Sequence, residues 1–164
     1  MHYFELYNIP IGLSIDQALL KKKYYQLSKQ YHPDYQLATT DDATQQVQLQ
    51  QAAMVNEGYK VLQYGYATLE YVLLLKGIIT PNEKYVLPPQ FLMQVMDLNE
   101  DVVTNQAEIK KLEEALYASV AALLQLQDVS TLEAKDWELL KLYYYQQKYI
   151  NRLLQRVAGN DVEI

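Results

Sequence analysis

Two side chains that could transfer protons or form ion pairs, His32 and Asp34, flank a single proline, Pro33. A histidine beside a carboxylate could act as an acid–base pair, but catalysis would also require a pocket and a group that positions a substrate. The other histidine is His2 and the chain has no cysteine, so metal or nucleophilic chemistry has few residues to use. An enzyme with a His32–Asp34 dyad is kept as an alternative, and a binding role is favoured.

The tripeptide closes a predicted helix that is apolar on one face and basic elsewhere. Its apolar side chains recur at steps of four, three and four: Leu20, Tyr24, Leu27 and Tyr31. Its lysines lie off this face: Lys21, Lys22, Lys23 and Lys29. Ser14 or Asp16 can cap its start. Because Pro33 disfavours α geometry at the residue before it, the helix is expected to end at His32 or one residue earlier. His32 and Asp34 are thus expected on a turn after a basic helix.

Composition and charge restrict the possible classes of function. The chain has 164 residues, half of them apolar, and a net charge of −6. Residues 90–164 carry 7 basic and 12 acidic side chains, a net charge of −5. This acidic balance argues against nucleic-acid binding, and the 16 tyrosines are expected to pack in cores rather than stack on bases. No signal peptide or membrane span is expected, so the cytoplasm is the expected location.

An all-α fold in two domains is predicted, because no β-alternation is sustained over the length of a strand. Residues 1–77 should form an antiparallel helical hairpin with short flanking helices, and residues 78–88 a linker. Asp41 or Asp42 should open the second helix of the hairpin after a polar loop, residues 35–40. Residues 89–164 should form a three-helix bundle. Its last helix is expected to follow a Ser130–Glu133 capping box and to bury one stripe: Leu139, Tyr143, Ile150, Leu153 and Val157.

The first 75 residues resemble a J-domain. A short aromatic helix is followed by the basic helix and then directly by His32-Pro33-Asp34. The next helix is similar to the Asn-x-Ala-Tyr-x-x-Leu pattern of that family through four residues: Asn56, Gly58, Tyr59 and Leu62. The resemblance implies docking on a heat-shock ATPase of the seventy-kilodalton class. It also implies that Asp34 pairs with an arginine of that ATPase.

Two later stretches narrow the resemblance to the iron–sulfur co-chaperones of HscB type. Residues 69–77 resemble the Ala-Glu-Tyr-Leu-Leu-x-x-x-Gly stretch of those proteins, and residues 91–98 resemble the Phe-Leu-Met segment that opens their C-terminal bundle. The resemblance implies a regulatory co-chaperone that is not an enzyme and needs no metal or cofactor. It would stimulate the ATPase and bring the iron–sulfur scaffold protein to it. A J-domain protein with another client is the alternative.

Two sets of binding residues follow. The chaperone-binding set comprises Lys21, Lys22, Lys29, His32, Pro33 and Asp34. The scaffold-binding set comprises Leu92, Met93, Met96, Asp97, Glu100 and, by similarity, Tyr149 on the last helix. Phe91, Val95 and Leu98 already supply one inward stripe of their helix, which should leave the methionines partly exposed. The alternatives are a solvated lysine face and a second set that simply forms bundle core.

Overall fold

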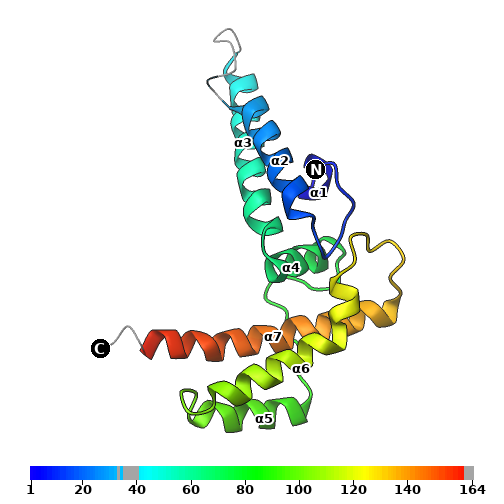
Figure 1. Cartoon of the computed structure of the whole chain (residues 1–164). Helices are drawn as coiled ribbons and strands as arrows, with labels where there is room; N and C mark the ends of the chain where they lie inside the picture. Colours follow the sequence, from blue (N-terminus) through cyan, green and yellow to red (C-terminus); the bar gives the residue numbers. More distant parts are fainter. Residues whose placement is uncertain (33, 35–40, 161–164) are drawn as a thin grey trace. The chain divides into compact units, whose positions relative to one another are not determined.

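A computed structural model of the chain describes residues 1–32, 34 and 41–160, the last four by their backbone alone. Every regular element of the described residues is an α-helix, which confirms the all-α fold class (Figure 1). In chain order these are α1 (Tyr3–Leu6), α2 (Gln17–Tyr31), α3 (Asp42–Leu62), α4 (Gly65–Leu75), α5 (Pro89–Glu100), α6 (Gln106–Leu124) and α7 (Ala134–Asn160). No helix in the described ranges combines the length and the apolar character that crossing a membrane requires.

The chain divides into two compact units. The first contains Met1–Val72 together with Leu126–Thr131, and the second contains Leu73–Gln125 together with Leu132–Ile164. This division differs from the boundaries expected from the sequence in three respects. The first unit already ends at Val72, so residues 73–77 belong to the second unit. Residues 78–88 belong to the second unit, and a short piece of the expected C-terminal bundle belongs to the first.

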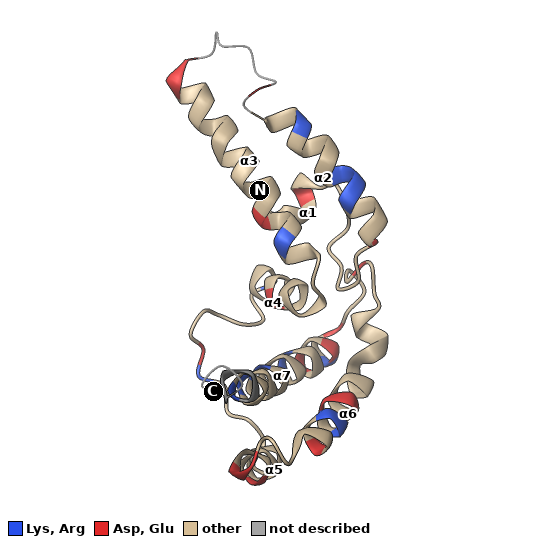
Figure 2. Cartoon of the chain, turned by 60° about the vertical axis from the view of Figure 1, so that its left-hand side comes forward, with Lys and Arg blue, Asp and Glu red and all other residues tan. Residues whose placement is uncertain are grey.

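The first unit is built on a hairpin of α2 and α3, which lie side by side (Figures 1 and 2). Each helix begins at a capping aspartate, and both aspartates were among the candidates predicted from the sequence. Asp16 accepts a hydrogen bond from the Leu19 N–H at 3.1 Å, and Asp41 accepts one from the Thr44 N–H at 2.9 Å. Hydrogen bonds from Thr44, side chain and backbone, hold the pKa of the Asp41 carboxyl below its ordinary value. Each helix therefore begins with one of its free backbone N–H groups bonded to the cap and with a negative charge at the positive end of the dipole.

Tyrosines join the helices of this unit. The buried Tyr7, just after α1, donates its hydroxyl to the Val55 carbonyl of α3 at 2.8 Å. Burial raises the pKa of Tyr7, so its hydroxyl keeps the proton that this bond needs. Tyr24 of α2 stacks on Tyr59 of α3, with ring centroids 4.0 Å apart and planes 12° apart. The expected packing role therefore holds for these tyrosines.

A segment that lies between α6 and α7 in sequence, Leu126–Thr131, completes the first unit. Leu13 donates its N–H to the Leu126 carbonyl at 2.8 Å. A Cβ added at Gly12 would lie only 2.3 Å from the carbonyl oxygen of Gln127. Position 12 therefore needs glycine because two stretches of backbone approach each other there.

The second unit is a three-helix bundle of α5, α6 and α7 with one continuous apolar cluster. The expected inward stripe of α5, Phe91, Val95 and Leu98, is buried in it. The rest of the cluster comes from the flanking segments and the other two helices: Leu87, Val102, Ile109, Ile150 and Leu153. The expected inward positions of α5 are thus confirmed.

The inward face of α7 differs from the expected one at its start. Leu139 is 46% exposed, whereas Leu140 is fully buried, so the predicted inward position was wrong by one residue. Gln147 also lies on the buried face, where its Nε2 donates to Glu113 Oε2 of α6 at 2.9 Å. The predicted capping box is wrong as well, because α7 begins at Ala134. The side chain of Val157 lies outside the described part.

The expected linker, residues 78–88, is held to the start of α7. Glu83 accepts hydrogen bonds from Lys141 at 3.0 Å and from the Tyr145 hydroxyl at 2.6 Å. Tyr85 stacks on Tyr145, with ring centroids 4.5 Å apart. The bonds from Tyr145 and Lys141 hold the pKa of the Glu83 carboxyl below its ordinary value. The segment therefore contributes to the packing of the second unit.

Candidate functional site

The turn after α2 presents the first candidate site. Helix α2 ends at Tyr31, and His32 has an extended backbone with φ −69° and ψ 133°. This confirms the predicted end of the helix. The side chain of Asp34 is 86% exposed and that of His32 is 52% exposed. Pro33, the third residue of the predicted tripeptide, lies outside the described residues. The aspartate is therefore presented to solvent, where another molecule can reach its carboxylate.

The imidazole of His32 supports this turn. Its Nδ1 accepts a hydrogen bond from the Asp34 backbone N–H at 3.2 Å and lies 3.6 Å from Asp34 Oδ2. A nitrogen that accepts this bond carries no hydrogen of its own, so it cannot at the same time donate to the carboxylate. In a general-base dyad the carboxylate orients the imidazole by accepting from a ring N–H. The observed arrangement instead uses the ring to hold the backbone of the turn.

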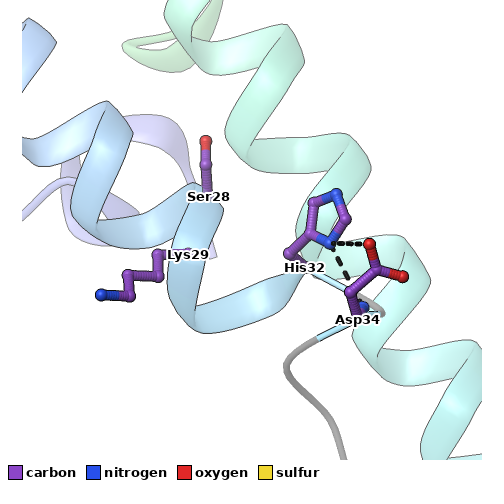
Figure 3. Close-up of a pocket in the computed structure, with 4 residues that line it drawn as sticks. All are labelled: Ser28, Lys29, His32 and Asp34. Atoms are coloured by element: carbon purple, nitrogen blue, oxygen red, sulfur yellow. Dashed lines mark hydrogen bonds and ion pairs between the residues drawn. The ribbon is translucent and has the colours of Figure 1, made fainter.

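A hollow of about 420 Å³ lies beside the turn, lined by Ser28, Lys29, His32 and Asp34. Figure 3 shows that Ser28 and Lys29 come from the last turns of α2 and that His32 and Asp34 follow it. The Ser28 hydroxyl oxygen is buried and forms no hydrogen bond with the described atoms. Sequence patterns did not single out Ser28, because a serine inside an amphipathic helix carries no signal of its own.

The basic face of α2 is smaller than its lysine count suggests. Lys21, Lys22 and Lys29 are exposed, as expected. Lys23 instead turns toward the end of α1, where its Nζ donates to the carbonyls of Tyr7 at 2.9 Å and Asn8 at 2.8 Å. Lysine at this place satisfies carbonyls that the helix end leaves without intrahelical partners. Of the four lysines expected off the apolar face, Lys23 therefore has a structural role at the end of α1.

The second candidate site lies on the outer face of α5. Met93 and Met96 are 66% and 65% exposed, and Asp97 and Glu100 are exposed as well. The methionines are therefore not bundle core. Methionine side chains are flexible and polarisable, which suits a contact surface. Exposed apolar side chains gathered on one helix are typical of an interaction surface.

Two other predicted members of this site are partly core. Leu92 and Tyr149 are half-buried and pack against the apolar cluster of the bundle. The Tyr149 ring also meets Phe91 edge-on, with centroids 6.3 Å apart and planes 84° apart. Both residues therefore link the exposed surface to the packed interior, which gives the surface a rigid base.

A hollow of about 140 Å³ between α5 and α7 joins part of the predicted set to residues that sequence patterns missed. Helix α5 contributes Val95, Met96 and Asn99. Helix α7 contributes Tyr149, Arg152, Leu153 and Arg156. The structure thus brings Met96 and Tyr149 together, while Met93, Asp97 and Glu100 lie outside this hollow. The three-residue and four-residue steps along α7 could have indicated that the arginines share the face of Tyr149.

Comparisons with known proteins concern both halves of the chain. A family model described as the HSCB C-terminal oligomerisation domain matches residues 87–158. A co-chaperone protein HscB homolog of Vibrio cholerae serotype O1 (strain M66-2) is 38% identical over 103 residues, which is 62% of this chain and 60% of that relative. A homolog from Aliivibrio salmonicida is 30% identical over 164 residues, covering 96% of this chain and 95% of that protein.

Solved structures give a matching picture. The chaperone HscB from Vibrio cholerae has a TM-score of 0.67 and 28% sequence identity, with 99% of each chain covered. The human co-chaperone protein HscB has a TM-score of 0.76 and 23% identity, covering all of this chain and 84% of the human one. At that identity the human structure supports the fold alone.

Proposed function

The chain belongs to the HscB family of co-chaperones, and on this premise we propose that it acts as an adaptor between two proteins. Its first unit would stimulate ATP hydrolysis by a heat-shock chaperone of the seventy-kilodalton class. Its second unit would bind the iron–sulfur scaffold protein and bring it to that chaperone. The assembly and transfer of iron–sulfur clusters would be assisted as a result, with the cluster as cargo and the chain itself not acting as an enzyme.

The observation that carries the first part is the 86% exposed carboxylate of Asp34 at the end of the basic helix α2. Lys21, Lys22 and Lys29 would attract an acidic groove of the ATPase and orient the encounter. The carboxylate of Asp34 would then pair with an arginine of the ATPase, and a bidentate pair of this kind is directional. His32 would hold the turn so that the carboxylate is already in position.

Substitution of Asp34 tests this part. Asp34→Asn keeps the size of the side chain but removes its charge, and loss of one partner from a buried charge pair costs roughly 2–5 kcal/mol. We expect stimulation of the ATPase to fall to background in a single-turnover hydrolysis assay. Circular dichroism and the melting temperature should not change, because the side chain is exposed.

Glu57→Gln is the matched control, since it also removes one negative charge from an exposed position. Glu57 lies near the C-terminal end of α3, away from the turn that carries Asp34. It should stimulate the ATPase as the parent chain does. An Asp34→Asn variant that retained full stimulation would disprove the first part of the proposal.

The second part is supported by the exposed methionine pair of α5 and the half-buried Leu92 and Tyr149 beneath it. We propose that this apolar surface binds the scaffold protein, with Asp97 and Glu100 pairing with basic groups at its edge. Leu92→Ala combined with Met96→Ala should weaken scaffold binding at least tenfold, because central apolar contacts carry most of the energy of an interface.

Isothermal titration calorimetry with the apo scaffold protein measures this effect. Leu139→Ala is the control, because Leu139 is also an exposed apolar residue of the second unit but lies outside the surface. If the parent chain gave no binding, the chain would serve another client. If the parent bound and the double variant bound equally well, the scaffold protein would bind a different surface of the chain.

A further inference from the structure

Both arginines of this chain, Arg152 and Arg156, line the hollow between α5 and α7. All other basic side chains are lysines, apart from the two histidines. The two arginines are exposed and four residues apart, so they lie on one face of α7. They gather two positive charges on a half of the chain whose net charge is −5.

The guanidinium of Arg156 is already held in place. Its Nη1 donates to Asn99 Oδ1 of α5, which leaves most of its five N–H donors for other partners. None of the ion pairs formed among the described residues includes either arginine. The floor of the hollow is apolar, since Val95 and Leu153 are buried there. A charge-assisted hydrogen bond is stronger beside such a surface than in bulk water.

The charged residues of α5 lie farther round the helix from α7 than Met96 does. At 100° per residue, Met96 is about 60° round the helix from Asn99, Glu100 about 100° and Asp97 about 160°. Asn99 marks the side that faces α7, because it lines the hollow and bonds Arg156. All charged residues of α5 are acidic (Figure 2). The surface therefore runs from arginines on α7, across an apolar centre, to carboxylates on the far flank of α5.

We propose that Arg152 and Arg156 bind a carboxylate, an Asp or Glu side chain of the scaffold protein, at the mouth of this hollow. This inference rests on the scaffold-binding role proposed above and assigns the orientation of that contact. A guanidinium presents paired N–H donors that match the two oxygens of a carboxylate. At about 140 Å³ the hollow suits one side chain rather than a small-molecule ligand, for which 300–1,000 Å³ is typical.

The opposite charges on the two flanks give this contact its specificity. A scaffold surface with an acid opposite α7 and a base opposite the far flank of α5 would be attracted in one orientation. In the reversed orientation like charges would meet on both sides, which is costly. The arginines are thus specificity-determining residues of an interface whose affinity comes mainly from its apolar centre.

Calorimetric titration of the apo scaffold protein into the full chain tests the inference. Arg152→Gln combined with Arg156→Gln should weaken binding roughly 10- to 100-fold at low salt, as expected for the loss of charge-assisted bonds. The matched control is Lys110→Gln combined with Lys111→Gln on α6. It also removes two positive charges, but from residues that do not line the hollow. The control should bind within about twofold of the parent, since exposed charges outside the contact have little effect. Arg156→Lys should be intermediate, because a lysine keeps the charge but cannot form the two-pronged pair.

The outcomes separate this inference from the proposed function. If the parent binds the scaffold protein and the double arginine variant binds as tightly, the inference is wrong and the proposed function stands. Equal weakening by the lysine control would also overturn it, because the effect would then be one of total charge. If the parent itself does not bind, both the scaffold-binding function and the inference fail. The fluorescence of Trp137, the single tryptophan, shows whether each variant retains a folded second unit. Should the double variant not fold, Arg156→Lys and the salt dependence of the parent decide the matter: full parental affinity, or no salt dependence, would count against the inference.

Discussion

The two candidate surfaces are built in opposite ways. The surface of the first unit comes from one continuous stretch, Lys21–Asp34, and is dominated by charge. The surface of the second unit is assembled from α5 and α7, which are far apart in the chain, and has an apolar centre with opposite charges on its flanks. A charged surface attracts and orients a partner, whereas an apolar one gains affinity by removing area from water. This difference agrees with the roles proposed above, in which the first unit regulates an ATPase through a brief contact and the second unit holds a client.

The largest expected effect comes from testing a variant of each surface in both assays, ATPase stimulation and scaffold binding. Asp34→Asn should abolish ATPase stimulation while changing scaffold affinity by no more than about twofold, because the two sites share no contacting residue. Leu92→Ala with Met96→Ala should do the reverse. Single-turnover hydrolysis and calorimetry on the same preparations measure both. Loss of both activities in either variant would mean that the surfaces are not separate.

The second surface depends on the bundle beneath it. The next largest effect is therefore expected from a substitution in the core of the second unit, which should lower the free energy of unfolding of that unit. Leu140→Ala removes a fully buried side chain of α7, and such truncations cost roughly 2–5 kcal/mol. Leu139→Ala, its exposed neighbour, should change the free energy of unfolding by less than about 1 kcal/mol. Urea unfolding followed by Trp137 fluorescence reports on the second unit. Equal effects of the two substitutions would contradict the buried face assigned to α7.

Salt should distinguish the surfaces by a smaller margin. Raising the ionic strength from low to physiological values and beyond should weaken ATPase binding more steeply than scaffold binding, since lysine contacts are screened and apolar contacts are not. We expect a roughly tenfold loss for the first contact and a loss of a few fold for the second, the latter arising from the arginines. Affinities measured over a salt series check this. Equal slopes would remove the proposed contrast between charge and burial.

The smallest effect concerns stability at acid pH, because each unit contains an aspartate whose pKa is lowered. Hydrogen bonds from the hydroxyl and N–H of Thr104 hold the pKa of Asp101 low, as those from Thr44 do for Asp41. A carboxyl whose pKa is lower in the folded chain than in the unfolded chain stabilises the fold at any pH above its unfolded-state pKa. This stabilisation is lost as the pH falls through the folded-state pKa. Asp41→Asn should reduce the acid sensitivity of the first unit, and Asp101→Asn that of the second.

Melting curves between neutral pH and about pH 3, which spans the ordinary aspartate value near 3.9, measure both effects. Trp137 fluorescence follows the second unit, and circular dichroism includes the first. An Asp101→Asn variant whose tryptophan signal kept the parental pH dependence would show that this cap does not contribute.

Local patterns predicted the first surface well. The spacing of Leu20 and Tyr24 indicated the face of α2, Pro33 indicated where the helix ends, and Asp16 was one of two expected caps. These features depend on interactions within about four residues along the chain, which is the range that helix periodicity and capping cover. Lys23 is the exception, because its carbonyl partners lie 15 and 16 residues earlier.

The second surface was predicted only in part. The inward stripe of α5 left Met93 and Met96 exposed, as expected. The arginines were missed because a face of α7 gains its meaning only from the helix that lies against it. Leu139 and Leu140 show the same limit, since both fit a helical stripe and only the tertiary packing of α7 decides which of them is buried.

The amino-acid sequence by itself therefore determined the helices, the caps of α2 and α3, the exposed turn at Asp34 and the family resemblance. Tertiary structure alone decided that Lys23 serves α1, that residues 78–88 are anchored through Glu83, and that Arg152 and Arg156 flank Met96. The physical reason is the range of the interactions. Backbone hydrogen bonds and steric limits act between near neighbours in the chain, whereas side-chain packing and ion pairing depend on which distant segments meet.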